Sequence, residues 1–468
     1  MKRIVVIPLM LTAAVTAAAQ WSMDRCISYA LDRATAVKVK ALEAANASTD
    51  VGIVLSDFLP SVSASTAVQY SWGRNVDPET NTYNTVTTFN NYYSLYTSIQ
   101  LFDGGQTINR FRQARLSRQQ SQTQLQQAQD DKAIEVMQKY VDADYAQQCV
   151  ALATEKLDES RQLLAKTRRM EELGLKGLPD VVQIESQVAE ADYNLTHQQN
   201  QFQSAMLALK SAMNYPAGEE LEIGGYREER DSMGSSLSSL TSLSSLSSLT
   251  RNARNTRDAS QARTASQASD ATPASPFLPQ AIIAEQSVRN ARLAYQISKG
   301  RLLPSLSLQA GVSTSYFRNI FGGGTASPFH SQFWDNMGEY VAAQLSLPLF
   351  ELSRYKNVRK AKRNVEIAKI EREETLRKLS DDSRQALLDC EGYGKEVEKM
   401  ERKVESDSLA YHLSSRKYEE GMLSTFDLHT ASQSYLESRI HLLQAQMLYI
   451  IKQRLVRYYQ TGTLKESE

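Results

Sequence analysis

Two stretches that lie far apart in the chain begin almost identically and then alternate strictly between two kinds of side chain. Residues 58–65 read FLPSVSAS, and residues 302–309 read LLPSLSLQ. Behind each proline, larger and mostly apolar residues take every second position, as far as Trp72 in the first stretch and Tyr316 in the second. This alternation predicts β-strands whose two faces meet different surroundings. A soluble sheet over an apolar core would produce it, and so would a membrane barrel with lipid outside and water inside.

Two further segments alternate in the same way, from Tyr93 to Leu101 and from Val341 to Leu349. The sequence therefore predicts four strands, at 60–73, 92–102, 304–317 and 340–350. The segments between the paired strands are rich in Asn, Thr, Asp, Pro or Gly, and they predict long loops at 73–91 and 318–338.

Most of the remaining chain has the composition and periodicity of helices. Two long helical hairpins are predicted over 106–215 and 353–459, with breaks at 174–180 and 421–427. Shorter helices are predicted over 21–55, where Asp24 is placed to cap the start, and over 277–300. Spacings of three and four residues between apolar side chains indicate coiled-coil packing, as in Val181, Ile184, Val188 and Ala191.

The order of helix, strand pair and helical hairpin occurs twice, which predicts an internal duplication. The first repeat covers 20–215 and the second covers 277–460. Asp180 follows Gly174 by the same interval as Asp427 follows Gly421. A low-complexity tract rich in Ser, Leu and Arg lies between the repeats and lacks the residues to build a core. We interpret 216–276 as an insertion between the repeats, and 461–468 as a C-terminal tail.

The first 19 residues have the features of a secretory signal peptide, with Lys2 and Arg3, an apolar segment and a small-residue cleavage site before Gln20. No apolar run of about 18 residues follows, so any crossing of a membrane must use strands. The formal net charge is +0, which gives no electrostatic reason to expect nucleic acid as a partner. The three cysteines are scattered, and Cys26 is interpreted as a buried thiol, with lipidation as the alternative.

No pattern in the sequence indicates an enzyme. The five histidines are isolated from one another, and the chain has neither a glycine-rich phosphate loop nor a cysteine pair. We therefore expect no catalytic residue, no metal site and no cofactor.

Four strands per chain constrain the assembly. Four tilted strands cannot close a barrel, and an open edge cannot face lipid because its backbone groups would lack hydrogen-bond partners. Two chains would give about eight strands, whose interior fills with side chains, whereas about sixteen strands leave a channel. Twelve strands from three chains are the intermediate, whose lumen small serine side chains could keep open. The expected fold is therefore a mixed α+β membrane protein. Its long α-helical coiled-coil hairpins form a tunnel, and four transmembrane strands per chain form a trimeric 12-stranded β-barrel.

Several short motifs occur in order along both halves of the chain. They are the helix start at 21–31, Leu-Pro-Ser at 59–61 and 303–305, LFDGG at 101–105 and YEEGMLSTFDL at 418–428. Through them, nearly the whole chain after the signal peptide resembles the TolC-like outer-membrane efflux protein family. The resemblance implies a homotrimer in the outer membrane with its tunnel in the periplasm. It also implies two partners, a periplasmic adaptor (membrane fusion) protein and an inner-membrane pump that is proton-driven or of the ABC type.

The resemblance places the periplasmic mouth of the family at the two helix breaks. It implies that Asp427, Tyr418 and Asp180 form the gate, where three copies of an aspartate would make a negative ring. Each aspartate also follows a turn and begins a helix, a place where Asp commonly acts as a cap. The adaptor-docking positions that it implies are Gly174, Leu175, Gly421, Met422 and Leu423.

The chain departs from the family pattern at two tip positions. Leu423 stands where well-known members carry a basic residue, and Thr430 stands where some carry a second aspartate. The salt-bridge latch that those residues form is therefore not expected here.

The function expected from these features is that of a passive trimeric channel. It would serve as the outer-membrane exit duct of a tripartite efflux or type I secretion system, opened by engagement of the adaptor and pump. The alternative is a periplasmic coiled-coil adaptor or scaffold protein, which would also have long helical hairpins.

Overall fold

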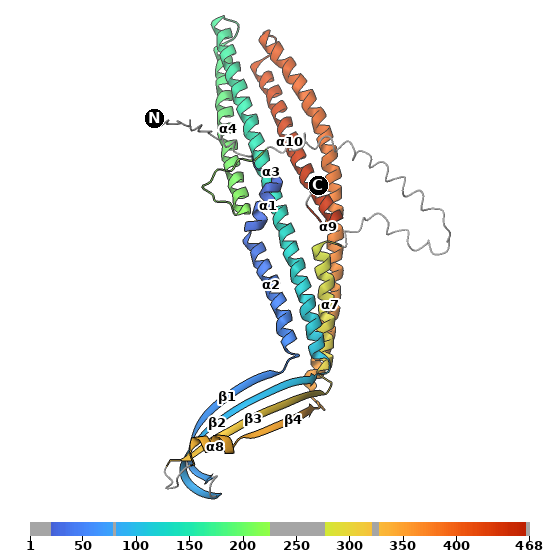
Figure 1. Cartoon of the computed structure of the whole chain (residues 1–468). Helices are drawn as coiled ribbons and strands as arrows, with labels where there is room; N and C mark the ends of the chain where they lie inside the picture. Colours follow the sequence, from blue (N-terminus) through green and yellow to red (C-terminus); the bar gives the residue numbers. More distant parts are fainter. Residues whose placement is uncertain (1–19, 78–80, 225–276, 321–326, 465–468) are drawn as a thin grey trace, which may run out of the picture. The chain divides into compact units, whose positions relative to one another are not determined.

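The structure is a computed structural model that describes residues 20–77, 81–224, 277–320 and 327–464. These residues form two compact units, each drawn from both halves of the chain (Figure 1). Among the described residues, the helical unit takes 20–39, 126–224, 277–278 and 377–464, and the sheet unit takes 40–77, 81–125, 279–320 and 327–376. The predicted signal peptide at 1–19 and the stretches 225–276 and 465–468 of the predicted insertion and tail lie outside the described residues.

The sheet unit contains one antiparallel sheet of four strands, in the order β1-β2-β3-β4. Its strands are β1 (Ser61–Asp77), β2 (Thr82–Phe102), β3 (Ser305–Asn319) and β4 (Gly338–Ser346). The two predicted strand pairs are therefore joined edge to edge through β2 and β3, although more than 200 residues of chain lie between the end of β2 and the start of β3.

The register of the sheet places the predicted apolar residues on one common face. Ala64 lies opposite Leu95, and Leu95 lies opposite Val312. Because side chains alternate between the faces of a strand, this pairing brings the apolar sets of neighbouring strands to the same side. Small polar groups meet on the other face, where the hydroxyl oxygens of Ser65 and Ser94 lie 2.7 Å apart. The prediction of strands with one apolar and one polar face is confirmed.

The prediction of a long loop over 73–91 is wrong. Strand β1 continues to Asp77, and β2 already begins at Thr82, so that Trp72 pairs with Thr87 inside a longer hairpin. The Asn and Asp residues of this segment suggested a loop, but its Thr, Tyr and Phe residues favour strands once they are paired.

The second predicted loop also contains regular structure, because helix α8 (Phe329–Asp335) lies within 318–338. Residues 321–326 of this loop lie outside the described residues. Strand β4 ends at Ser346 rather than near 350. Pro348 follows shortly afterwards, and proline has no N–H group with which to continue the hydrogen-bonded ladder.

Helices α2 (Thr35–Ser56), α3 (Gln106–Glu172), α7 (Pro279–Gly300) and α9 (Leu352–Glu419) contribute residues to the sheet unit. The change from β2 to α3 takes place within Asp103, Gly104 and Gly105, as the sequence predicted. The carboxylate of Asp103 accepts hydrogen bonds from the backbone N–H of Thr107 at 2.7 Å and from its hydroxyl at 2.6 Å. Asp103 therefore satisfies a free donor at the start of α3.

The helical unit contains the two predicted hairpins, α3 with α4 (Leu178–Met213) and α9 with α10 (Thr425–Thr461) (Figure 1). Its main core is formed by α1 (Met23–Arg33), α3, α4 and α10. Tyr140 is fully buried there, and its hydroxyl oxygen lies 3.0 Å from the Trp21 carbonyl oxygen and 2.5 Å from that of Gly224. The buried phenol thus connects the residues just before α1 and the segment after α4 to the middle of α3.

The predicted single helix over 21–55 is two helices, α1 and α2, separated at Ala34. The side-chain amide of Asn214 donates to the carbonyl oxygen of Arg33 at 3.2 Å, which satisfies a carbonyl group that the break leaves free. Ser22 rather than Asp24 caps α1, because its hydroxyl oxygen accepts the backbone N–H of Arg25 at 3.3 Å. No helix among the described residues is long and apolar enough to span a membrane.

We expect Gly104→Ala to destabilise the sheet unit more than Gly105→Ala. Both glycines have a positive φ, +70° and +78°, which costs other residues about 1 kcal/mol or more. Only at Gly104 would the added Cβ also meet backbone, at 2.3 Å from the carbonyl oxygen of Gly300. Thermal unfolding of the detergent-extracted variants, followed by circular dichroism, measures the difference. Equal losses in melting temperature would show that the close approach to Gly300 does not constrain the fold.

Candidate functional site

The turn that ends α3 has the backbone geometry of a Schellman motif. Gly174 follows the helix with a φ of +74°, a conformation that glycine adopts without steric cost. The N–H of Leu175 donates to the carbonyl oxygen of Met170 at 2.8 Å, and the N–H of Gly174 donates to that of Glu171 at 2.8 Å. These two bonds satisfy carbonyl groups that the end of the helix leaves free.

The turn that ends α9 repeats this geometry. Gly421 has a φ of +77° and its N–H donates to the carbonyl oxygen of Tyr418 at 3.0 Å, while the N–H of Met422 donates to that of Lys417 at 2.9 Å. Both tips thus place a residue in the left-handed backbone conformation directly after the helix, and glycine is needed there, as at the predicted turn positions Gly174 and Gly421.

Asp180 lies in the first turn of α4 and contacts the other hairpin. Its carboxylate accepts a hydrogen bond from the hydroxyl of Thr425, at the start of α10, and one from the backbone N–H of Gly177 at 3.3 Å. The bond from Thr425, with smaller contributions from Gly177 and the charge of Lys176, lowers the pKa of Asp180 below its ordinary value of 3.8, against the opposing effect of burial. Asp180 therefore stays ionised near neutral pH and links α4 to α10.

Asp427 makes contacts only with its own helix start in the part of the chain that the structure describes. Its backbone N–H donates to the hydroxyl oxygen of Ser424 at 3.1 Å, and that hydroxyl donates back to the Asp427 carboxylate at 2.7 Å. Ser424 is thus the cap of α10, and Asp427 supports it from an exposed position. The role of Asp427 in a gate stays a prediction.

Tyr418 is buried between the hairpins, with a relative exposure of 1%. Its ring packs with Ile184 of α4 and Leu428 of α10, and its hydroxyl forms a 2.9 Å hydrogen bond with that of Thr167 in α3. Within a single chain, then, Tyr418 contributes to the packing of both tips. Its place at a constriction stays a prediction.

Lys176 completes the link between the tips. Its ammonium group lies 4.4 Å from the centre of the Tyr418 ring and donates to the carbonyl oxygen of Leu423 at 3.3 Å. We use the name tip clasp for three contacts between the hairpins: Asp180 with Thr425, Thr167 with Tyr418, and Lys176 with both Tyr418 and Leu423.

The sequence alone indicated no role for Lys176, Thr167 or Thr425. One signal for Lys176 was present, because it follows Gly174 by the same two positions that separate Leu423 from Gly421. The basic residue missing from the second tip is thus found in the first. No local pattern predicts the contacts of the two threonines, because each contact joins residues about 250 positions apart.

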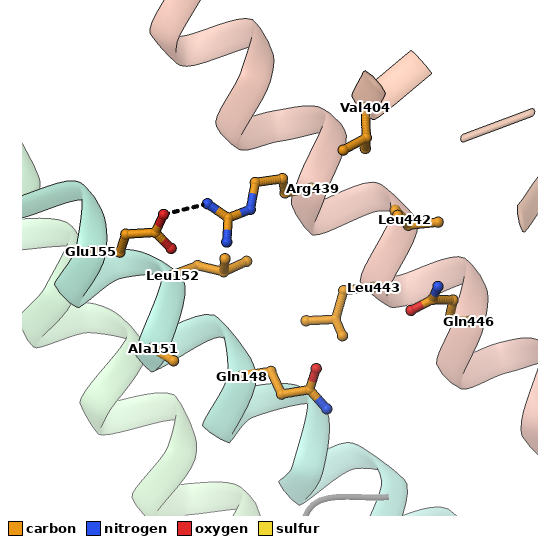
Figure 2. Close-up of a pocket in the computed structure, with 9 residues that line it drawn as sticks. All are labelled: Gln148, Ala151, Leu152, Glu155, Val404, Arg439, Leu442, Leu443 and Gln446. Atoms are coloured by element: carbon orange, nitrogen blue, oxygen red, sulfur yellow. Dashed lines mark hydrogen bonds and ion pairs between the residues drawn. The ribbon is translucent and has the colours of Figure 1, made fainter. Parts of the chain in front are cut away.

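A cleft of about 330 Å³ lies between α3, α9 and α10, away from the tips. Figure 2 shows Arg439 of α10 pointing to Glu155 of α3, with Leu152, Leu443 and Val404 around them. The two charged groups are 2.8 Å apart, and the hydrogen bond from Arg439 lowers the pKa of Glu155. A partly exposed pair of this kind contributes about 1 kcal/mol or less, so it helps to hold α3 against α10.

No group of three or more His, Cys, Asp or Glu side chains that could hold a metal ion occurs among the residues described. Cys26 and Cys149 are buried and Cys390 is half-buried, and none of the three forms a disulfide among the described residues. The burial of Cys26 agrees with its interpretation as a core thiol.

A profile of the outer membrane efflux protein family matches residues 26–215 and 280–458. The chain belongs to this family. The matched segments include all four strands and both tips, and they leave out the whole of the predicted insertion at 216–276. Members of the family are passive channels of the outer membrane and not enzymes, which confirms the predicted location and the absence of an enzymatic role.

Solved structures of several channels share the fold. CusC has 16% sequence identity and a TM-score of 0.73, with 93% of this chain and 91% of that chain covered. VceC from Vibrio cholerae has 13% identity and a TM-score of 0.73, with 93% and 95% covered. The open state of MtrE from Neisseria gonorrhoeae has 17% identity and a TM-score of 0.67, with 92% and 86% covered. A search of curated proteins found no match.

We expect Asp180→Asn to lower the melting temperature near neutral pH, because the neutral amide is a weaker acceptor for Thr425 and Gly177 than the carboxylate. The lowered pKa of Asp180 gives the sign of the pH dependence. Its contribution is complete above the ordinary value of 3.8 and is lost as the pH falls through the lowered value. The difference in melting temperature between the wild type and the variant should therefore be constant from neutral pH to about pH 4 and shrink below it.

The matched control is Asp427→Asn, which removes a carboxylate at the same position of the other tip. Because the hydrogen bonds of the Asp427 side chain to described residues stay within its own turn, at Ser424, its loss should lower the melting temperature less. A larger effect of Asp427→Asn, or a difference for Asp180→Asn that grows in acid, would contradict the tip clasp.

Proposed function

We propose that three copies of this chain form one channel, with a 12-stranded β-barrel in the outer membrane and an α-helical tunnel in the periplasm. The channel is the passive exit duct of a tripartite efflux or type I secretion system. A periplasmic adaptor and an inner-membrane pump open it, and the pump, proton-driven or of the ABC type, supplies the energy. The two halves of the chain arose by duplication, in keeping with the matching turns at Gly174 and Gly421.

The observation that carries this proposal is the sheet. Strands β1 and β4 form its two outer edges and pair on one side only among the described residues. An open edge in lipid leaves N–H and C=O groups without partners, at a cost of several kcal/mol each. Pairing β4 of one copy with β1 of the next joins the two outer edges of the sheet, and three copies supply the strand number that keeps a lumen open.

The two faces of the sheet support the same orientation. The apolar face carries exposed side chains such as Val62, Leu95 and Val341, which suit contact with lipid. The polar face carries paired serines, including Ser61 and Ser98 with hydroxyl oxygens 3.0 Å apart, which suit a lumen filled with water. This arrangement gives no support to the alternative of a soluble adaptor or scaffold, which has no use for an exposed apolar sheet face.

The helix tips carry the proposed docking and gating functions. Leu175 and Met422 occupy the same position after their turn glycines and are 70% and 66% exposed. Apolar side chains exposed at both turns suit docking of the adaptor, together with Gly174, Gly421 and Leu423. Asp427, Tyr418 and Asp180 form the gate in this proposal, with the tip clasp holding the hairpins of one chain together until a partner binds.

The proposed gate is tested by the double variant Thr425→Val/Tyr418→Phe in planar bilayers. Both changes keep the shape of a buried side chain and remove a hydroxyl of the tip clasp. We expect the wild type to conduct and the double variant to show a higher open probability, because hairpins that are held less firmly separate more readily.

Thr430→Val is the matched control, because among the described residues the Thr430 hydroxyl bonds only to the carbonyl oxygen of Phe426 in its own helix, at 3.0 Å. It should conduct as the wild type does. Absence of conductance in all three proteins would contradict the channel. Equal open probability in the double variant and in Thr430→Val would contradict gating by the tip clasp.

A further inference from the structure

Strand β4 is much shorter than its neighbour β3, and α8 lies where β4 is missing. The pairing of β3 with β4 begins at Ser305 and ends at Ser313, whereas β3 continues to Asn319. Figure 1 shows α8 against this end of the sheet. Beyond Ser313, the edge of β3 therefore needs hydrogen-bond partners other than a strand.

Two side chains of α8 and its end supply these partners. The side-chain amide of Gln332 accepts the backbone N–H of Phe317 at 2.9 Å and donates to the carbonyl oxygen of the same residue at 3.0 Å. The amide of Asn336 donates to the carbonyl oxygen of Ser315 at 2.8 Å. Gln332 thus makes the pair of bonds that a residue of a neighbouring strand would make. Groups that are unprotected at this edge of a membrane wall would be costly, and α8 protects them.

Aromatic packing holds α8 on the apolar face of the sheet. The ring of Phe333 lies 5.5 Å from that of Tyr93, and the ring of Phe329 lies 5.3 Å from that of Tyr316. The hydroxyl of Thr314 donates to the carbonyl oxygen of Phe333 at 2.7 Å. Tyr93, Thr314 and Tyr316 belong to the same face as Leu95 and Val312. The helix therefore covers the side of the sheet that the proposed barrel turns to lipid.

The outer surface of α8 combines exposed aromatic rings with polar groups. Phe329 is 46% exposed and Trp334 is 58% exposed, and His330 lies beside Trp334 with ring centres 6.5 Å apart. Aromatic rings with polar neighbours are enriched where membrane proteins pass from the acyl chains to the headgroups. Along the same strands, Tyr70 and Phe89 pack ring to ring at 5.1 Å, so the aromatic surface continues beyond α8.

A hollow of about 440 Å³ lies beside α8 on the same face. Its walls are mainly apolar and include Thr66, Leu95, Val312, Phe333 and Met337. Because the hollow opens from the apolar face, an acyl chain is the occupant that matches its chemistry in the proposed barrel.

We propose that α8 is an interfacial lipid anchor of the channel. Trp334 and Phe329 lie at the boundary between acyl chains and headgroups of the outer leaflet, and the hollow beside α8 holds part of a lipid acyl chain. Gln332 and Asn336 at the same time close the wall where β4 ends. This inference rests on the proposed function, because it takes the apolar face of the barrel to be the lipid face.

Fluorescence quenching by brominated lipid tests the anchor. In the variant Trp21→Phe/Trp72→Phe, Trp334 is the one tryptophan that remains of the three in the chain. The protein is reconstituted in phosphatidylcholine vesicles whose acyl chains carry bromine near either the glycerol or the methyl end. We expect loss of Trp334 emission in both, with the greater loss for bromine near the glycerol end. Loss of emission only with aqueous iodide would overturn the anchor, because Trp334 would then face water.

A second probe separates this inference from the barrel itself. The variant Val341→Trp in a background with all three native tryptophans changed to Phe places the fluorophore on the apolar face of β4, opposite Ala310 of β3. Bromine near the methyl end should quench this probe most. If it is quenched and Trp334 is not, the anchor fails and the barrel stands. If neither is quenched by lipid, the proposed orientation of the barrel fails, and the anchor with it.

Discussion

Backbone groups at the edge of a strand must find hydrogen-bond partners, and the sheet unit depends on how each edge meets this need. Inside the sheet the four strands satisfy one another. Where β4 stops, the side chains of Gln332 and Asn336 take its place. Pro60 and Pro304 stand immediately before strands, where a missing N–H group does no harm. The backbone groups at the outer edges of β1 and β4 still lack partners in a single chain, and a barrel shared between chains provides them.

The helical unit ends in two turns where the last carbonyl groups of a helix likewise need hydrogen-bond donors. Gly174 and Gly421 let the last carbonyl groups of α3 and α9 be satisfied within a tight turn, so that each hairpin reverses without exposing its backbone. The contacts between the tips are different in kind, because they rest on single hydrogen bonds, one packed ring and the exposed ion pair of Lys166 with Glu419 rather than on a large core. A few weak contacts over a small core suit an element that a partner must move. The same tips expose Leu175 and Met422, so a partner has apolar surface to bind where the contacts are weakest.

Much of the fold could be predicted because periodicity is a local property. The alternation around Val62 and Leu306 predicts which side chains share a face of each strand, and the pairing of the strands brings the apolar faces to one side of the sheet. The interval from Gly174 to Asp180, which recurs in the second half, predicts the position of both tips. Three features were missed for physical reasons. The paired strand ends beyond Trp72 are rich in Asn, and their polar residues suggested a loop. Helix α8 is too short to show a helical period in the sequence. The partners of Tyr418 and Asp180 come from other elements, and no local pattern reveals such contacts.

The central claim is that the strands of one chain are part of a barrel shared by three. The most direct test is the mass of the particle extracted with detergent from the outer-membrane fraction, measured by native mass spectrometry after the detergent is removed. A particle of three chains, found only in that fraction, is the predicted result. A single chain that remains in solution without detergent would contradict the shared barrel, since its apolar sheet face and its two open edges would then have to be compatible with water.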